Sequence, residues 1–135
     1  MKTKPVLTLA DAQRMVDAAK QYAEAHQLAV TIAVADDSGS LLALARLDGA
    51  SPLSAHIGPA KAHTAALGRR ETKGMEDMIN QGRTAFLSVP LVHGMLEGGV
   101  PVIVDGEVAG SIGVSGVKPN EDAAIARAGI AALGL

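Results

Sequence analysis

Three charged side chains stand where they could bind or transform a small molecule: Arg46, Lys61 and Glu97. Arg46 ends an apolar run, and an arginine in that setting needs a carboxylate partner or a polar edge. Asp48 and Glu97 are the carboxylates that could pair with it. The alternative is that its guanidinium fork binds the carboxylate of a ligand, with two parallel hydrogen bonds.

Lys61 lies in an alanine-rich helical run, and Glu97 lies among apolar residues beside two glycines. A lysine on such a helix can extend to solvent along its own methylene stem. If it is enclosed instead, the charged ammonium is disfavoured, and Lys61 becomes a candidate base or a site for anions. Glu97 is the candidate carboxyl group for proton transfer.

The four histidines are His26, His56, His63 and His93. His56 and His63 are seven positions apart, about 10 Å along a helix axis, so they cannot chelate one metal ion within a subunit. No H-x-x-x-H or H-E-x-x-H motif occurs, and the sequence predicts no preformed metal site. His26 follows a predicted helix, where its charge is a favourable cap. His63 and His93 remain as candidate cofactor ligands.

Glycines at 110, 113 and 116, within the stretch DGEVAGSIGVSG, superficially resemble a phosphate-binding loop. Their spacing is G-x-x-G-x-x-G inside a predicted strand, whereas a dinucleotide loop needs G-x-G-x-x-G at the start of a helix. The Lys and Ser or Thr of a Walker loop are also missing. We therefore expect these glycines to let a helix or a neighbouring backbone approach the sheet, or to mark a bulge.

Composition limits the other classes of function. The chain has 135 residues, enough for one domain spanning 1–135, with 12 basic and 14 acidic residues, no cysteine and almost no aromatics. Nucleic-acid binding needs clustered cations and stacking rings, so it is excluded as an expected function.

No apolar run is long enough to cross a bilayer, and no signal peptide is recognisable, so we expect a soluble, cytoplasmic protein. The high apolar content without large aromatic side chains predicts a homo-oligomer.

Hydrophobic periodicity predicts an α+β order of elements. Apolar residues at helical spacing predict a helix from residue 9 to about 26, opened by a capping box of Thr8 and Asp11. Alternating runs predict hairpins over 28–48 and 100–116. Further helices are expected over 56–68, 72–82 and from Asn120, with Pro59 in the first turn of its helix. Small residues on one strand face predict a helix lying close against it.

Several motifs together resemble the GlcG/HbpS-like haem-binding family. They are Arg46 to Gly49, Lys61 to Ala65, Gly98 to Pro101, Asp105 to Gly116, and Glu121 with Asp122, and the resemblance runs from Leu7 to Leu133. It implies a five-stranded antiparallel sheet with helices on both faces, similar to profilin or PAS domains. It also implies oligomers up to octamers and, in some members, haem. Residues 8–25 contain no histidine, unlike haem-binding relatives with one in the first helix.

Three functions follow from the residues and the resemblance. The first is a haem, tetrapyrrole or other small-ligand binding protein, a sensor or carrier, with His63 or His93 on the iron and Lys61 or Arg46 at the propionates. The second is an enzyme acting on an organic acid or carbonyl compound, with Arg46 as anchor and Lys61 and Glu97 in proton transfer. The third is a non-catalytic assembly module. We expect residues 70–99 to lie beside the ligand and to be the most mobile.

Overall fold

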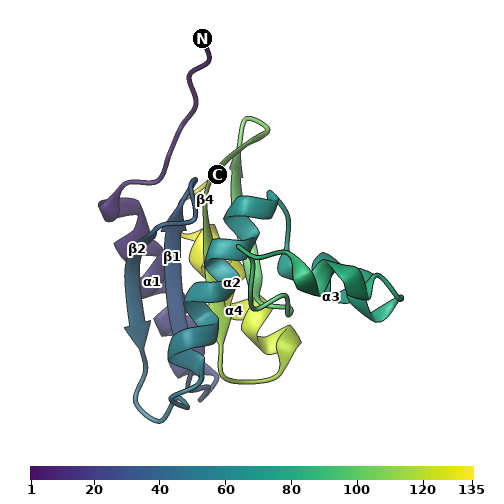
Figure 1. The fold of residues 1–135 in the computed structure, drawn as a ribbon. Coiled ribbons are helices and arrows are strands. Elements are labelled where there is room, and N and C mark those ends of the chain that lie inside the picture. Colours follow the sequence, from purple (N-terminus) through teal and green to yellow (C-terminus); the bar gives the residue numbers. More distant parts are fainter.

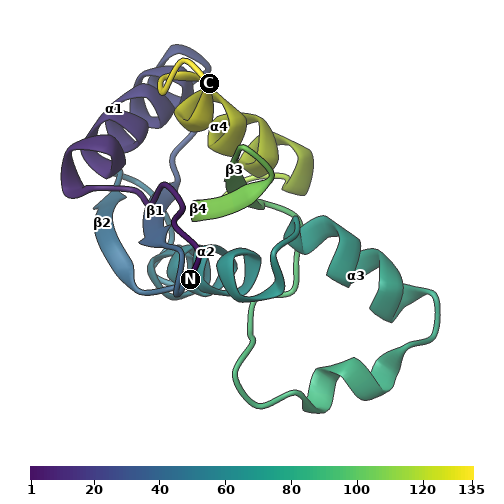
Figure 2. The ribbon, with the colours of Figure 1, turned by 90° about the horizontal axis from the view of Figure 1, so that it is seen from above.

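The computed structural model describes all residues from 1 to 135 and arranges the chain in three layers (Figure 1). Helices α1 and α4 cover one face of a central sheet, and α2 covers the other, as the view from above shows (Figure 2). The elements are α1 (Leu9–Ala25), β1 (Thr31–Asp36), β2 (Leu41–Arg46), α2 (Ser54–Gly68), α3 (Thr72–Asn80), the 3-10 helix η1 (Thr84–Ser88), β3 (Gly99–Val104), β4 (Glu107–Ser115) and α4 (Pro119–Ala131). The α+β order predicted from periodicity is confirmed.

The sheet has four strands in the order β2-β1-β4-β3, all antiparallel, so the expectation of five strands was wrong. The two predicted hairpins supply all four strands, and they join through β1 and β4. The stretch before α1 adds only one backbone bond to the sheet, from Leu7 N–H to the Ala109 carbonyl, 2.9 Å long. Pro5 has no N–H to donate, which prevents this stretch from continuing as a strand.

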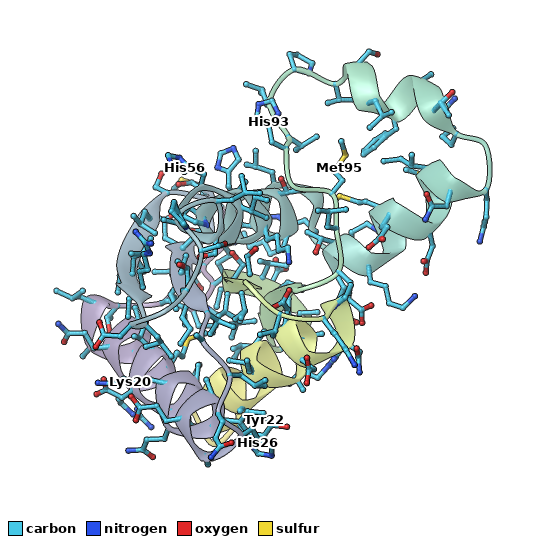
Figure 3. The ribbon with its side chains drawn as sticks, turned by 90° about the horizontal axis from the view of Figure 1, so that it is seen from below. Lys20, Tyr22, His26, His56, His93 and Met95 are labelled. Atoms are coloured by element: carbon cyan, nitrogen blue, oxygen red, sulfur yellow. The ribbon has the colours of Figure 1, made fainter.

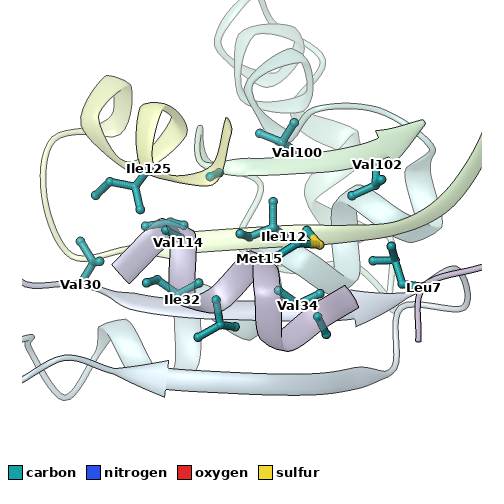
Figure 4. Close-up of a cluster of buried hydrophobic side chains, with 14 of the residues drawn as sticks. Leu7, Met15, Val30, Ile32, Val34, Val100, Val102, Ile112, Val114 and Ile125 are labelled. Carbon is teal, nitrogen blue, oxygen red and sulfur yellow. The ribbon is translucent and has the colours of Figure 1, made fainter. Parts of the chain in front are cut away.

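The main core lies between the sheet and the α1–α4 layer (Figure 4). Alternate β1 residues, Ile32 and Val34, point into it because side chains on a strand alternate between faces. Met15 of α1 and Ile125 of α4 close it from the helical side, and all four are fully buried. The opposite sheet face carries alanines against α2. The prediction that a helix lies close against the strand face of small residues is confirmed.

Two helix starts differ from those expected from the sequence. Helix α2 begins at Ser54, which puts Pro59 in its second turn rather than its first. Helix α4 begins at Pro119 with Lys118 as its cap residue, so Asn120 does not cap it. The Glu121 carboxylate accepts the Lys118 N–H at 3.2 Å, which leaves no need for an Asn side chain there. At α1, the Thr8–Asp11 capping box forms as predicted.

Residues 70–98 leave the layered body as one excursion, which we call the α3–η1 excursion (Figure 2). It contains α3 and η1 and returns to the sheet at β3. No helix of the protein combines the length and apolar character that a membrane span requires.

Candidate functional site

Lys61 is enclosed, which decides between the two alternatives left by the sequence. The residue is 3% exposed, and its Nζ donates to the Val114 carbonyl at 2.9 Å and to Asp122 Oδ2 at 3.2 Å. Lys61 belongs to α2 and Asp122 to the first turn of α4. Because these helices cover opposite faces of the sheet, the ion pair ties the two helical layers together past the end of β4.

Asp122 is buried as deeply as its partner. Its second oxygen, Oδ1, accepts the Val117 N–H at 3.2 Å. Burial raises the pKa of Asp122, while the Lys61 ammonium and the Val117 N–H act in the opposite direction. The carboxyl group therefore holds its proton to a higher pH than a surface aspartate, and Lys61 is engaged with it rather than free to act as a base.

The ion pair forms the floor of a cleft of about 260 Å³, the ion-pair cleft, lined by Lys61, Asp122, Glu76, Glu97 and Ser115 among others. Glu76 belongs to α3, and its Oε1 accepts the Glu97 N–H at 2.8 Å. The Glu97 carboxylate itself has no hydrogen-bond or ion-pair partner in the structure. Two of the residues singled out from the sequence, Lys61 and Glu97, therefore meet here.

His63 is held at both ends of its ring. Nδ1 lies 2.9 Å from the Gly39 carbonyl oxygen, and Nε2 lies 3.2 Å from that of Leu91. The imidazole thus connects the β1–β2 turn to the α3–η1 excursion. A metal ligand needs a ring nitrogen with a free lone pair, so binding iron through His63 would require at least one of these contacts to open.

His93 is in the opposite situation. Its side chain is exposed, and no hydrogen-bond partner for the ring is found in the structure. Its backbone is fixed by Thr64 of α2: the Thr64 hydroxyl donates to the His93 carbonyl at 2.5 Å and accepts its N–H at 3.1 Å. The backbone is therefore held while the imidazole remains free to bind a metal centre.

The His93 side chain borders a groove of about 480 Å³, the apolar groove, between α2, α3 and η1. Its apolar lining comes from Ile57, Ile79, Leu87, Val92, Met95 and Leu96. His93 and Met95 lie on the stretch that returns from η1 toward the sheet (Figure 3). A volume of this order is typical of small-molecule and cofactor sites, whose linings are mostly apolar with few polar groups.

Arg46 lies apart from all of these residues. Its Nε and Nη2 donate to the Ala50 carbonyl at 3.2 Å and 2.9 Å, so the expected pairing with Asp48 or Glu97 was wrong. Its side chain borders a different cleft of about 510 Å³, shared with Lys20 and Glu24 of α1. A backbone carbonyl close in sequence satisfies the guanidinium, which removes the need for a carboxylate.

Sequence reasoning missed Asp122, Glu76 and Ser115 as parts of the ion-pair cleft. Asp122 was noticed only as part of a motif shared with the family, yet a lysine among alanines needs a counter-charge if it is enclosed. That requirement was the available signal. No signal pointed to Glu76 or Ser115, because their meeting depends on where α3 leaves the sheet.

The fold and these clefts define a three-layer α+β domain with two adjoining clefts of roughly small-molecule size where the α3–η1 excursion meets α2. Comparison with family models identifies the group. Residues 7–131 match the family described as "Haem degrading protein HbpS-like", and the chain belongs to this family.

Individual relatives agree with that assignment. Protein GlcG of Escherichia coli K12 is 54% identical over 115 residues, which cover 85% of each chain. A crystal structure of a double mutant of Streptomyces reticuli HbpS is 34% identical, with a TM-score of 0.90 over 100% of this chain and 92% of that one. A crystal structure of a PduOC:heme complex is 27% identical, with a TM-score of 0.84 and 94% coverage of both chains.

Proposed function

We propose that the protein binds haem or a related tetrapyrrole in the apolar groove, with His93 as the iron ligand. The observation that carries this proposal is an imidazole free of hydrogen bonds on a fixed backbone, at the rim of an apolar groove of about 480 Å³. An apolar lining suits the macrocycle, and a histidine is a common axial ligand of haem iron. The residues present therefore fit the group.

The comparisons support haem-related binding in the same direction. The family is described as haem degrading, and one similar structure is a PduOC complex with heme. Bound haem would supply redox or gas-binding chemistry at its iron. The chain's own contribution would be to bind the macrocycle, hold the ligand nitrogen of His93 and limit water at one face. An open groove of this kind suits a sensor or carrier, in which haem enters and leaves.

Lys61 and Arg46 have no part in this proposal. Lys61 is engaged with Asp122 in the ion-pair cleft, and Arg46 borders a third cleft. The same separation weakens the hypothesis of an enzyme with Arg46 as substrate anchor, because within one chain that residue does not border the cleft of Lys61 and Glu97.

Hemin titration tests the haem proposal. We expect a saturable Soret shift for the wild-type protein and, for His93→Ala, at least about a tenfold loss of affinity, because the iron loses its ligand. His63→Ala should retain binding. His56→Ala is a matched control, since it removes an exposed histidine of α2 that does not line the groove. A spectrum that never saturates, or an unchanged affinity in His93→Ala, would reject the proposal.

We also propose a homo-oligomer formed through the α3–η1 excursion and the adjoining end of α2. Large apolar side chains are exposed there, including Leu53, Leu87, Leu91 and Leu96. Exposed apolar patches of this kind mark interaction surfaces. Residues of two subunits could then meet near the apolar groove.

Light scattering at micromolar concentration measures the assembly. We expect a mass of at least two chains, and a shift toward 13.7 kDa in Leu91→Glu, which would put a charge into the subunit contact. Leu135→Glu is the matched control, because Leu135 is as exposed as Leu91, at 69%, but lies at the C-terminus. A wild-type mass of one chain would contradict the proposal.

A further inference from the structure

We infer that the ion-pair cleft is a second binding site, which adjoins the apolar groove at Ile57, Glu76 and Leu96, and that it takes a small organic cation carrying a primary ammonium and a hydroxyl group. The inference concerns Lys61, Asp122, Glu76, Glu97 and Ser115, which line the cleft together. It does not depend on haem binding.

The charges around the cleft favour a cation. Three carboxyl groups line it, those of Glu76, Glu97 and Asp122, against the single ammonium of Lys61. That ammonium is directed to the Val114 carbonyl and to Asp122, so its charge is already matched. Glu76 and Glu97 then leave an excess of negative charge, which repels a carboxylate and attracts an ammonium group.

Glu97 supplies a free acceptor for such a cation. Its backbone N–H is fixed by Glu76, whereas its carboxylate has no partner in the structure. Lys73, the cationic residue of α3, interacts with Glu97 and Glu76 through its charge, but its ammonium pairs directly with Asp77 at 2.8 Å. A charged donor from a ligand would therefore gain a charge-assisted hydrogen bond that the protein does not satisfy by itself.

Ser115 is the independent sign of a ligand. It is only 8% exposed, yet its hydroxyl makes no hydrogen bond within the chain. Because no fully buried side-chain nitrogen or oxygen lacks a partner, this hydroxyl must reach the space of the cleft that Ser115 lines. The neighbouring hydroxyls of Thr31 and Ser54 bond to each other at 2.8 Å, so the free group at Ser115 stands out.

Size and lining restrict the ligand further. The cleft of about 260 Å³ has room for roughly nine water molecules at ~30 Å³ each, which favours a ligand of no more than about ten heavy atoms. Leu53, Ile57 and Leu96 add aliphatic walls that would contact a short methylene chain. An amino alcohol has the required parts: an ammonium for the glutamates, methylenes for the walls and a hydroxyl for Ser115.

Three probes of nearly equal size separate charge from shape: ethanolammonium chloride, ethylene glycol and sodium glycolate. Calorimetric titration of the full chain should show saturable binding of ethanolammonium, at least about tenfold tighter than that of ethylene glycol, and no binding of glycolate. Glycolate binding as tightly as ethanolammonium, or no saturation by ethanolammonium, would overturn the inference.

Variants tie the binding to the cleft. Glu97→Gln, which keeps the shape, and Ser115→Ala should each weaken ethanolammonium binding by about fivefold or more. Glu24→Gln is the matched control: it removes an exposed carboxylate from another cleft and should leave the affinity unchanged. Equal affinity in Glu97→Gln and wild type would also overturn the inference. Hemin titration of the same variants should be unaffected, so failure here and failure of the haem proposal remain distinguishable.

Discussion

Gly113→Ala is expected to destabilise the protein by about 3 kcal/mol, which corresponds to a fall of roughly 10 °C in Tm. Gly113 lies on β4, one of the two central strands, paired with Ala33 of β1 and Gly99 of β3. A Cβ added there would lie closer than 3.0 Å to the Gly58 carbonyl oxygen and the Ala62 backbone nitrogen of α2. Both are backbone atoms, so the whole helix would have to move away from the sheet.

Moving α2 would disturb more than one contact. The Ser111 hydroxyl donates to the Ala62 carbonyl at 2.5 Å, and Lys61 of the same helix is held by Val114 and Asp122. Relaxation at Gly113 therefore strains these buried hydrogen bonds as well. Well-packed interiors transmit such strain instead of absorbing it.

Gly74→Ala is the matched control for this substitution. Gly74 lies in α3, and the atoms nearest to an added Cβ belong to the flexible guanidinium of Arg70, which can move at little cost. An alanine inside a helix is also favoured over glycine, so a stability equal to or about 0.5 kcal/mol above wild type is expected. Thermal or urea unfolding compares the two variants. A Tm of Gly113→Ala close to that of wild type would show that the close packing of α2 on β4 does not require a glycine at position 113.

Gly113 also shows which features of the fold could be predicted from the sequence. Its place in an alternating strand, without a following helix, was enough to reject a phosphate loop and to predict either a close approach of a helix or a neighbouring backbone to the sheet, or a bulge. At Gly113 the structure shows the first of these alternatives, because α2 lies against the glycine. The hairpins and α1 were predictable for a related reason: their periodicity and caps are local, and local patterns are carried by neighbouring residues.

The candidate sites were less predictable because they depend on contacts between distant residues. Lys61 and Asp122 are 61 positions apart, and their pairing requires helices on opposite faces of the sheet to meet past β4. The difference between His63 and His93 depends on two carbonyl oxygens, of Gly39 and Leu91, that no motif marks. The α3–η1 excursion has no sustained periodicity near its return to the sheet. Neither the apolar groove nor the ion-pair cleft could therefore be predicted from its sequence.

Lys61→Met is expected to cost about 3 to 5 kcal/mol of stability, because it leaves Asp122 buried without its counter-charge. The two side chains are each 4% exposed, so little water reaches Asp122 to compensate for the lost ammonium. The Val114 carbonyl also loses its donor. Protonation of Asp122, which its raised pKa favours, would reduce the cost but would not restore the lost hydrogen bonds.

A double substitution separates the ion pair from simple loss of packing. Lys61→Met with Asp122→Leu removes both charges, and apolar replacement of a buried pair is often neutral or stabilising, so more than half of the lost stability should return. The surface pair Lys73–Asp77, about half exposed, provides the control: Lys73→Met should leave the free energy of unfolding close to that of the wild type, because solvent screens an exposed ion pair. Urea unfolding of the wild-type protein and of these three variants measures the differences in stability. If the double variant is no more stable than Lys61→Met, an unpaired buried charge is not the cause of the loss, and the tie between α2 and α4 rests on packing instead.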